Sequence, residues 1–201
     1  INMAKKKQTV EDQNLENVQE ALNTTSVWIE KNQNKLTWAV TIIVVLVVGA
    51  LALNTYVIKP KAVEASNENA KAVAYFMQGD WEKALNGDDA ECIGFQAVAD
   101  EYKCYQAGKL AALYTGVCYY QMGQFEDAAA YLNKFSADDL TIEPAALQLL
   151  GDAYAQMEDF AKAVKAFEAA AKSGNELIAP MSLKKAGLVY LELGDKAAAK
   201  K

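Results

Sequence analysis

Histidine and arginine are absent from the 201 residues, so all 20 basic side chains are lysines. Without histidine the chain has no imidazole, the commonest general base and a frequent metal ligand. Without arginine it has no guanidinium to hold a phosphate or carboxylate through two parallel hydrogen bonds. No nucleophile, base and orienting group stand in a catalytic pattern. These absences predict a protein that is not an enzyme and that uses no metal ion or cofactor.

Cysteine is scarce, and its three residues, Cys92, Cys104 and Cys118, lack the paired short spacings of a zinc site. They can be read as small buried apolar residues. Alternatively, a turn near residues 104–108 folds two antiparallel helices together and places Cys92 near Cys118. Cys92 and Cys104 would lie about 18 Å apart along one helix. If a disulfide forms, Cys92–Cys118 is therefore the pair that geometry favours.

The negative charge is concentrated after residue 61. The whole chain has a net charge of −6, whereas residues 62–201 carry 13 lysines and 21 acidic residues, a net of −8. An acidic domain repels nucleic acid, so we expect no nucleic-acid partner. The glycines show no phosphate-loop pattern, and we expect no small-molecule substrate.

Only one long uncharged apolar run is present, at residues 36–58. As a helix it reaches about 34 Å, slightly more than a hydrocarbon core of about 30 Å. Residues typical of a membrane–water interface flank it: Lys31, Lys35 and Trp38 before it, and Tyr56, Lys59 and Lys61 after it. Ala50-Leu51-Ala52 resembles a signal-peptidase site, but the apolar run continues beyond it and the preceding segment is too long. A retained single transmembrane helix is therefore predicted.

The flanking segments are short. Residues 1–35 form a polar tail, and apolar residues at helical spacing predict a membrane-proximal amphipathic helix over residues 11–34: Leu15, Val18, Leu22 and Ile29. Because Pro60 disfavours a continuing helix, residues 59–64 are expected to be a short linker. The lysines nearest the span number two before and three after it, so charge does not decide its orientation.

Residues 65–201 contain a repeat. Related hexapeptides stand at residues 79–84, 123–128, 158–163 and 194–199, at intervals of 44, 35 and 36 residues. A tyrosine precedes each one: Tyr75, Tyr119, Tyr154 and Tyr190. Glycine at the start of the hexapeptide permits a left-handed turn, and the acidic residue beside it can start a helix. The pattern predicts helix–turn–helix hairpins.

The spacing and residue types resemble the tetratricopeptide repeat. The clearest copy is residues 144–175, with Leu150-Gly151, Tyr154, Ala163, Phe167 and Ala170. Residues 109–137 have Leu132 where phenylalanine is usual, residues 65–105 are divergent, and the copy from Pro180 is incomplete. The resemblance implies an all-α fold, an α-solenoid over residues 65–201. It assigns packing between helices to Gly116, Tyr119, Ala128, Gly151, Tyr154, Ala163, Phe167, Gly187 and Tyr190.

The same resemblance implies a concave groove lined by the first helix of each hairpin. The matching positions are Leu110, Leu113, Val117, Tyr120, Gln121, Gln148, Asp152, Gln156, Met181, Lys184 and Leu188, with Leu191 and Glu192 beside them. Such a surface suits an extended or helical peptide with apolar anchors. Alternatively, leucines such as Leu188 and Leu191 pack under a further terminal helix. Leu113 and Val117 stand where repeats that clamp acidic chain ends have lysine and asparagine, so we do not expect that activity.

The layout of tail, span and repeat domain, with Gly79-Asp80-Trp81-Glu82-Lys83-Ala84-Leu85 in the first repeat, resembles the YfgM-like ancillary proteins of the bacterial Sec translocon. This resemblance implies a single-pass inner-membrane protein with a cytoplasmic N-terminus and a periplasmic repeat domain. It also implies a protein-interaction scaffold that cooperates with the translocon, a membrane-anchored periplasmic chaperone or emerging polypeptides. The alternative is a structural subunit of another envelope machine, for secretion, gliding or outer-membrane assembly.

Overall fold

A computed structural model describes residues 2–88, 91–137 and 139–200, with side chains from Val27 onward. Every regular element in this part of the chain is helical, and it contains no β-strand. The expected all-α class is confirmed. The chain forms two compact units, residues 1–57 and 58–201, and each is described separately.

The first unit consists of α1 (Asn2–Leu53) and most of the π-helix η1 (Asn54–Ile58). From Trp38 to Leu53 the large apolar side chains of α1 are exposed, Leu46 to 66%. The helix is therefore long and apolar enough to cross a membrane. The backbone of residues 11–34 is helical. The amphipathic stripe expected there stays a prediction, because most of its side chains precede Val27.

Helix replaces the expected linker at residues 59–64, because α2 (Lys59–Met77) begins at Lys59. Pro60 lies in the first turn of α2 and has no N–H to donate, and its ring crowds the carbonyl four residues earlier. That carbonyl belongs to Tyr56, within η1. Residues 54–58 before it are π-helical, so helix is present on both sides of the proline.

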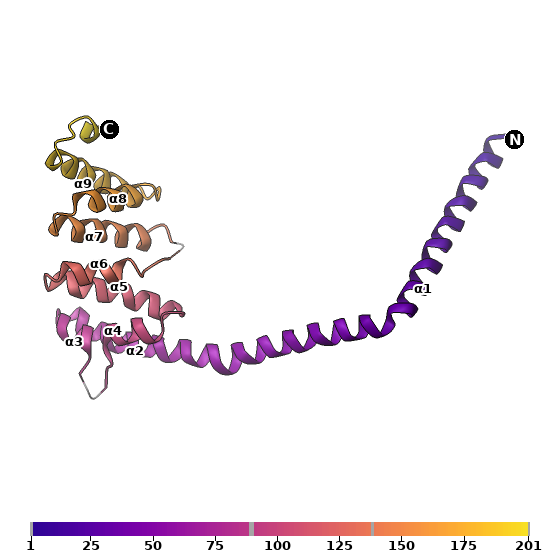
Figure 1. Cartoon of the computed structure of the whole chain (residues 1–201), viewed down its shortest axis with the longest axis horizontal. Coiled ribbons are helices and arrows are strands. Elements are labelled where there is room, and N and C mark those ends of the chain that lie inside the picture. Colours follow the sequence, from indigo (N-terminus) through magenta and orange to yellow (C-terminus); the bar gives the residue numbers. More distant parts are fainter. Residues whose placement is uncertain (1, 89–90, 138, 201) are drawn as a thin grey trace. The chain divides into compact units, whose positions relative to one another are not determined.

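The second unit is a stack of antiparallel helices (Figure 1). Its elements are α2, α3 (Trp81–Asn86), α4 (Gly94–Glu101), α5 (Gln106–Gln121), α6 (Phe125–Leu132), α7 (Ile142–Gln156), α8 (Phe160–Ala171), α9 (Ile178–Glu192) and the 3₁₀ turn η2 (Ala198–Lys200). From α4 onward each helix packs on the next one in the chain. The divergent first copy is divided among α2, α3 and α4, which pack on one another and on α5.

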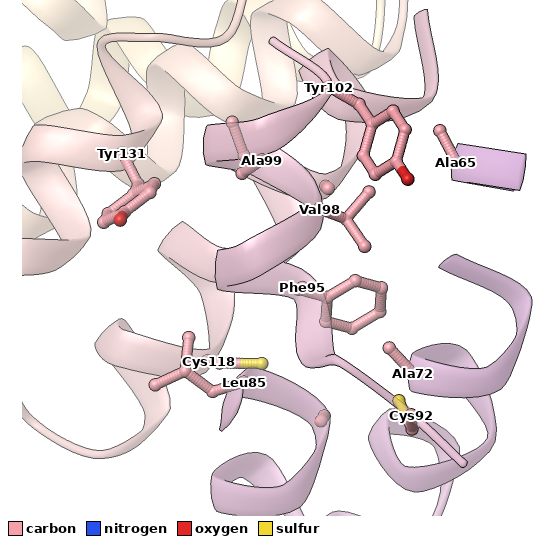
Figure 2. Packing of buried hydrophobic residues seen from close by; sticks show 13 residues of the cluster. Ala65, Ala72, Leu85, Cys92, Phe95, Val98, Ala99, Tyr102, Cys118 and Tyr131 are labelled. Atoms are coloured by element: carbon pink, nitrogen blue, oxygen red, sulfur yellow. The ribbon is translucent and has the colours of Figure 1, made fainter. Parts of the chain in front are cut away.

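The largest core cluster lies among α2, α3, α4 and α5. Figure 2 shows Phe95 and Val98 of α4 directed toward the helix that carries Ala65 and Ala72. The Phe95 ring stacks on Tyr114 with centroids 4.8 Å apart. Because the facing residues on α2 are alanines with no exposed surface, the two helices approach closely and the aromatic rings fill the remaining space. Smaller clusters join α6 to α7 and α8 to α9.

Cys92 and Cys118 are free, buried thiols, so the disulfide considered from the sequence is not present. Cys92 does not lie on a helix facing α5, as that geometry assumed. It precedes α4 in a turn where its N–H donates to Asp88 Oδ1 at 2.9 Å. Burial raises the pKa of the Cys118 thiol to about 12 and also raises the pKa of Cys92. Both side chains are therefore protonated core residues at neutral pH.

Candidate partner-binding groove

The same turn closes each hairpin. The first residue of every hexapeptide has a positive φ: +77° at Gly79, +75° at Gly123, +59° at Glu158 and +76° at Gly194. The N–H of the following residue donates to the carbonyl of the preceding tyrosine: Asp80 to Tyr75 at 3.1 Å, Gln124 to Tyr119 at 2.9 Å, Asp159 to Tyr154 at 2.9 Å and Asp195 to Tyr190 at 2.8 Å. This is the Schellman arrangement, which ends one helix and reverses the chain.

Aspartate then starts the following helix in three of the four copies. Asp80, Asp159 and Asp195 accept hydrogen bonds from the N–H groups of Lys83, Lys162 and Ala198, at 3.1, 3.2 and 2.9 Å. Gln124, at the same position before α6, makes no such side-chain bond. The sequence pattern of glycine followed by an acidic residue therefore corresponds to a real local structure, a helix end followed by a capped helix start.

Two of the repeat glycines lie where the helices of a hairpin touch. A Cβ atom on Gly116 would stand 2.6 Å from Cγ of Leu132, and one on Gly151 would stand 2.6 Å from the Phe167 ring. At Gly187 the nearest atom would be the carbonyl oxygen of Ala199, at 3.4 Å. The same glycine position is therefore closely packed in two hairpins and open in the last.

The repeat tyrosines fix each hairpin on the one before it. The Tyr119 hydroxyl donates to Gln96 Oε1 at 3.1 Å, and the Tyr190 hydroxyl donates to Glu168 Oε1 at 2.7 Å. The Tyr154 hydroxyl accepts from Asn133 Nδ2 at 2.8 Å. Glu168 raises the pKa of Tyr190 through this hydrogen bond. Gln96, Asn133 and Glu168 were missed in the sequence because they lie outside the repeat pattern.

The predicted groove residues lie on α5, α7 and α9, the first helices of three consecutive hairpins. Half-buried positions are Leu110, Leu113, Val117, Tyr120, Gln148 and Asp152, and exposed positions are Gln121, Gln156, Met181, Lys184 and Leu188. Leu113 and Tyr120 also pack against the cluster between α6 and α7. Those two side chains therefore contribute to the core as well as to the surface. The α9 positions are the most accessible, with Leu188 exposed to 55%.

Comparison with known families identifies these hairpins. Models of the tetratricopeptide repeat match residues 110–138 and residues 149–199. These two stretches are similar to tetratricopeptide repeats. The matched stretches include α6, α8, α9, residues 110–121 of α5 and residues 149–156 of α7. The glycines and tyrosines of the second, third and fourth copies lie within them. No curated protein matched the chain.

An ion pair joins α7 to α9 at one of the predicted groove positions. Lys185 Nζ of α9 lies 2.5 and 2.8 Å from the two carboxylate oxygens of Asp152 on α7, and 5.8 Å from the centre of the Phe167 ring. Burial raises the pKa of Tyr120 on α5, and the nearby negative charge of Asp152 raises it further. Sequence reasoning assigned Asp152 to the groove but missed Lys185. The signal was available, because Lys185 lies one helical turn before Leu188, the residue equivalent to Asp152 in the next repeat.

The predicted groove positions are mostly apolar or amide side chains. Between Val27 and Lys200, leaving aside the gaps at residues 89–90 and 138, no three acidic or cysteine side chains converge as a metal site. The chemistry of the groove consists of leucines and valine on α5, a neutralised carboxylate on α7, and leucines with one lysine on α9. Such a surface can bind a polypeptide through apolar contacts.

Proposed function

We propose that the protein is a membrane-anchored scaffold whose tetratricopeptide groove binds a protein partner. The observation that carries this proposal is the combination, in one chain, of an exposed apolar helical segment with a repeat domain. The apolar side chains exposed around the helix from Trp38 to Ile58 are unfavourable in water, and a bilayer supplies the matching environment. Tetratricopeptide repeats are typical of protein-interaction modules, and here accessible leucines lie on their first helices.

The groove favours a ligand with two apolar anchors. The α5 and α9 positions are mainly apolar, whereas α7 between them contributes Gln148, Gln156 and the Asp152 carboxylate. Because Lys185 already neutralises Asp152, the middle of the groove has little charge to offer a ligand. A helical or extended segment with apolar residues at its ends and polar residues between them therefore fits best.

For the location we propose a bacterial inner membrane, with the N-terminus in the cytoplasm and the repeats in the periplasm. The partners proposed are the Sec translocon and a membrane-anchored periplasmic chaperone, or chains emerging from the translocon. The support is the sequence resemblance of residues 79–85 and the order of tail, apolar helix and repeats. A structural role in another envelope machine is the competing assignment.

The test is crosslinking and co-purification of the full chain from native membranes in mild detergent. The wild type should recover Sec components, and Val117→Asp in the groove should reduce that recovery several-fold. Circular dichroism checks that a carboxylate at this half-buried position leaves the repeat domain folded. Ala130→Asp, at an exposed position on the second helix α6, is the matched control and should leave recovery unchanged.

Two results would overturn the assignment. Recovery of a different stoichiometric complex without Sec components would favour the structural-subunit alternative. Proteolysis of sealed cells and spheroplasts addresses orientation, because a periplasmic repeat domain is cleaved in spheroplasts. A domain that stays protected until the membrane is broken would be cytoplasmic, and a role at the periplasmic exit of a translocon would be wrong.

A further inference from the structure

One face of α9 is apolar and accessible. Its residues recur at helical spacing on one side of the helix: Met181, Lys184, Leu188, Leu191 and Glu192. Met181 and Leu191 are each 51% exposed and Leu188 is 55% exposed. Val117 and Asp152, which are equivalent to Leu188 in the two preceding repeats, are half-buried. Three large apolar side chains in a row of this kind are typical of a protein contact surface.

The charges on this face are arranged symmetrically about Leu188. Lys184 lies four residues before it and Glu192 four residues after it, one turn away on either side. Both are exposed, and neither forms an ion pair within the described part of the chain. If a second α9 lies antiparallel across the first, with a two-fold axis at Leu188, each Lys184 faces the partner's Glu192. The face is therefore complementary to itself.

We propose that this α9 face binds the same face of a second copy of the chain, antiparallel and centred on Leu188. Leu188 packs against its own copy at the two-fold axis. One Lys184–Glu192 ion pair on each side of the axis fixes the register of the two helices. The contact uses α9, which also supplies one end of the proposed groove, so a second copy and a groove ligand compete for that end. The two binding events are still separable by mutation, because Val117 on α5 belongs to the groove and lies outside the dimer contact.

Because the contact between two α9 helices buries little surface, we expect it to form only where the copies are concentrated. One pair of helices of this length is a small interface, below the roughly 1,000 Å² that stable complexes bury. Two copies held in the same membrane meet at a much higher effective concentration than two copies in dilute solution. We therefore expect the dimer in membranes that contain the full chain, and weak association in dilute detergent.

Disulfide crosslinking tests the two-fold axis. The chain is the full-length protein in native membranes with the exposed Cys104 replaced, Cys104→Ser, so that only buried thiols remain. Leu188→Cys should form disulfide-linked dimers on oxidation with copper–phenanthroline, because a residue at a two-fold axis meets its own copy at short range. Leu183→Cys is the matched control: Leu183 is 54% exposed but lies about 140° around the helix from Leu188. It should crosslink at least fivefold less.

Charge exchange tests the register. Adding Lys184→Glu to Leu188→Cys places two pairs of like charges at the interface and should reduce crosslinking several-fold. Adding Glu192→Lys as well restores opposite charges and should restore the crosslink. Equal crosslinking at Leu183 and Leu188 would mean random collision, and no effect of Lys184→Glu would mean another register; either result overturns the proposal. A Leu188→Cys crosslink to a different protein would also overturn it. Circular dichroism of the purified variants checks that each remains folded.

Discussion

Glu158 adopts in one hairpin the backbone conformation that glycine adopts in the other three. Its φ of +59° is left-handed, which a residue with a Cβ atom adopts at a cost of roughly 1–2 kcal/mol. The turn forms nevertheless, because the Asp159 N–H bond to Tyr154 and the Asp159 cap both stabilise it. The two hydrogen bonds of Asp159 therefore compensate for the strained backbone of Glu158, the one residue that departs from the glycine pattern.

We predict that Glu158→Gly stabilises the repeat domain by about 0.5–1 kcal/mol. Removing the Cβ relieves the left-handed strain, and the greater freedom of glycine in the unfolded chain offsets part of the gain. The measurement is the urea midpoint of unfolding, followed by circular dichroism. Gly123→Glu makes the reverse change at the equivalent turn and should lower the midpoint. A lower midpoint for Glu158→Gly would contradict the strain argument.

Two aspartates predict a loss of stability in acid. The N–H groups of Ile142 and Thr141 donate to Asp139 at 2.6 and 2.7 Å and hold the pKa of that carboxyl below its usual value. The hydrogen bonds from Lys162 lower the pKa of Asp159 in the same way. Each folded-state pKa lies below the unfolded one. The stabilisation is therefore complete above the unfolded value of about 3.9 and is lost as the pH falls through the folded value.

The corresponding experiment compares the urea midpoints of the wild type and Asp139→Asn between pH 3 and pH 7. Asparagine keeps an oxygen that can accept the two bonds but does not titrate. The variant should therefore lose less stability than the wild type as the pH falls below 4. Parallel curves for the two proteins would show that Asp139 does not contribute to the acid transition.

At the scale of the helix, one substitution is predicted to act in opposite directions in two hairpins. Gly151→Ala places a methyl group 2.6 Å from the Phe167 ring, and we expect this overpacking to cost about 1–3 kcal/mol. Gly187→Ala meets only the Ala199 carbonyl at 3.4 Å, and alanine favours a helix interior over glycine by up to about 1 kcal/mol.

Thermal unfolding should therefore show a lower Tm for Gly151→Ala and an unchanged or higher Tm for Gly187→Ala. Because both glycines occupy the same position in the repeat, propensity alone predicts the same sign for both. The difference arises only from the presence of a bulky residue on the paired helix. Equal shifts would mean that the contact between Gly151 and Phe167 does not limit the approach of α7 and α8.

The helices also show that the effects of proline and glycine cannot be predicted from the sequence alone. Pro60 was expected to end the helix, but it lies in the first turn of α2, directly after a π-helical segment. Helix α3 is only six residues long, and Gly87 and Gly94 beyond it approach backbone atoms too closely for any Cβ. Proline and glycine were visible in the sequence, but the contacts that decide their effect come from residues elsewhere in the fold.

For the whole molecule we predict that residues 59–201 fold without the apolar helix. All three core clusters begin at or after Ala65 and lie inside this unit. The fragment should be soluble, helical by circular dichroism and cooperative on heating. A shorter fragment from residue 78 lacks α2, leaves Phe95 and Val98 uncovered and should lose cooperativity in its first repeat. A fragment 59–201 that aggregates or unfolds without a transition would contradict this division.

The sequence by itself determined the features that depend on local or periodic chemistry. An uncharged apolar run predicts an apolar helix, and a recurring glycine, aspartate and tyrosine predict capped hairpins, because caps and turns form between residues a few positions apart. The tertiary structure alone decided which side chains meet across helices. Lys185 joins Asp152, Gln96 and Glu168 accept from the repeat tyrosines, and Cys92 and Cys118 stay apart as buried thiols. Those outcomes depend on how neighbouring hairpins stack, and the stacking arises from packing between residues 20 to 40 positions apart, which no local pattern contains.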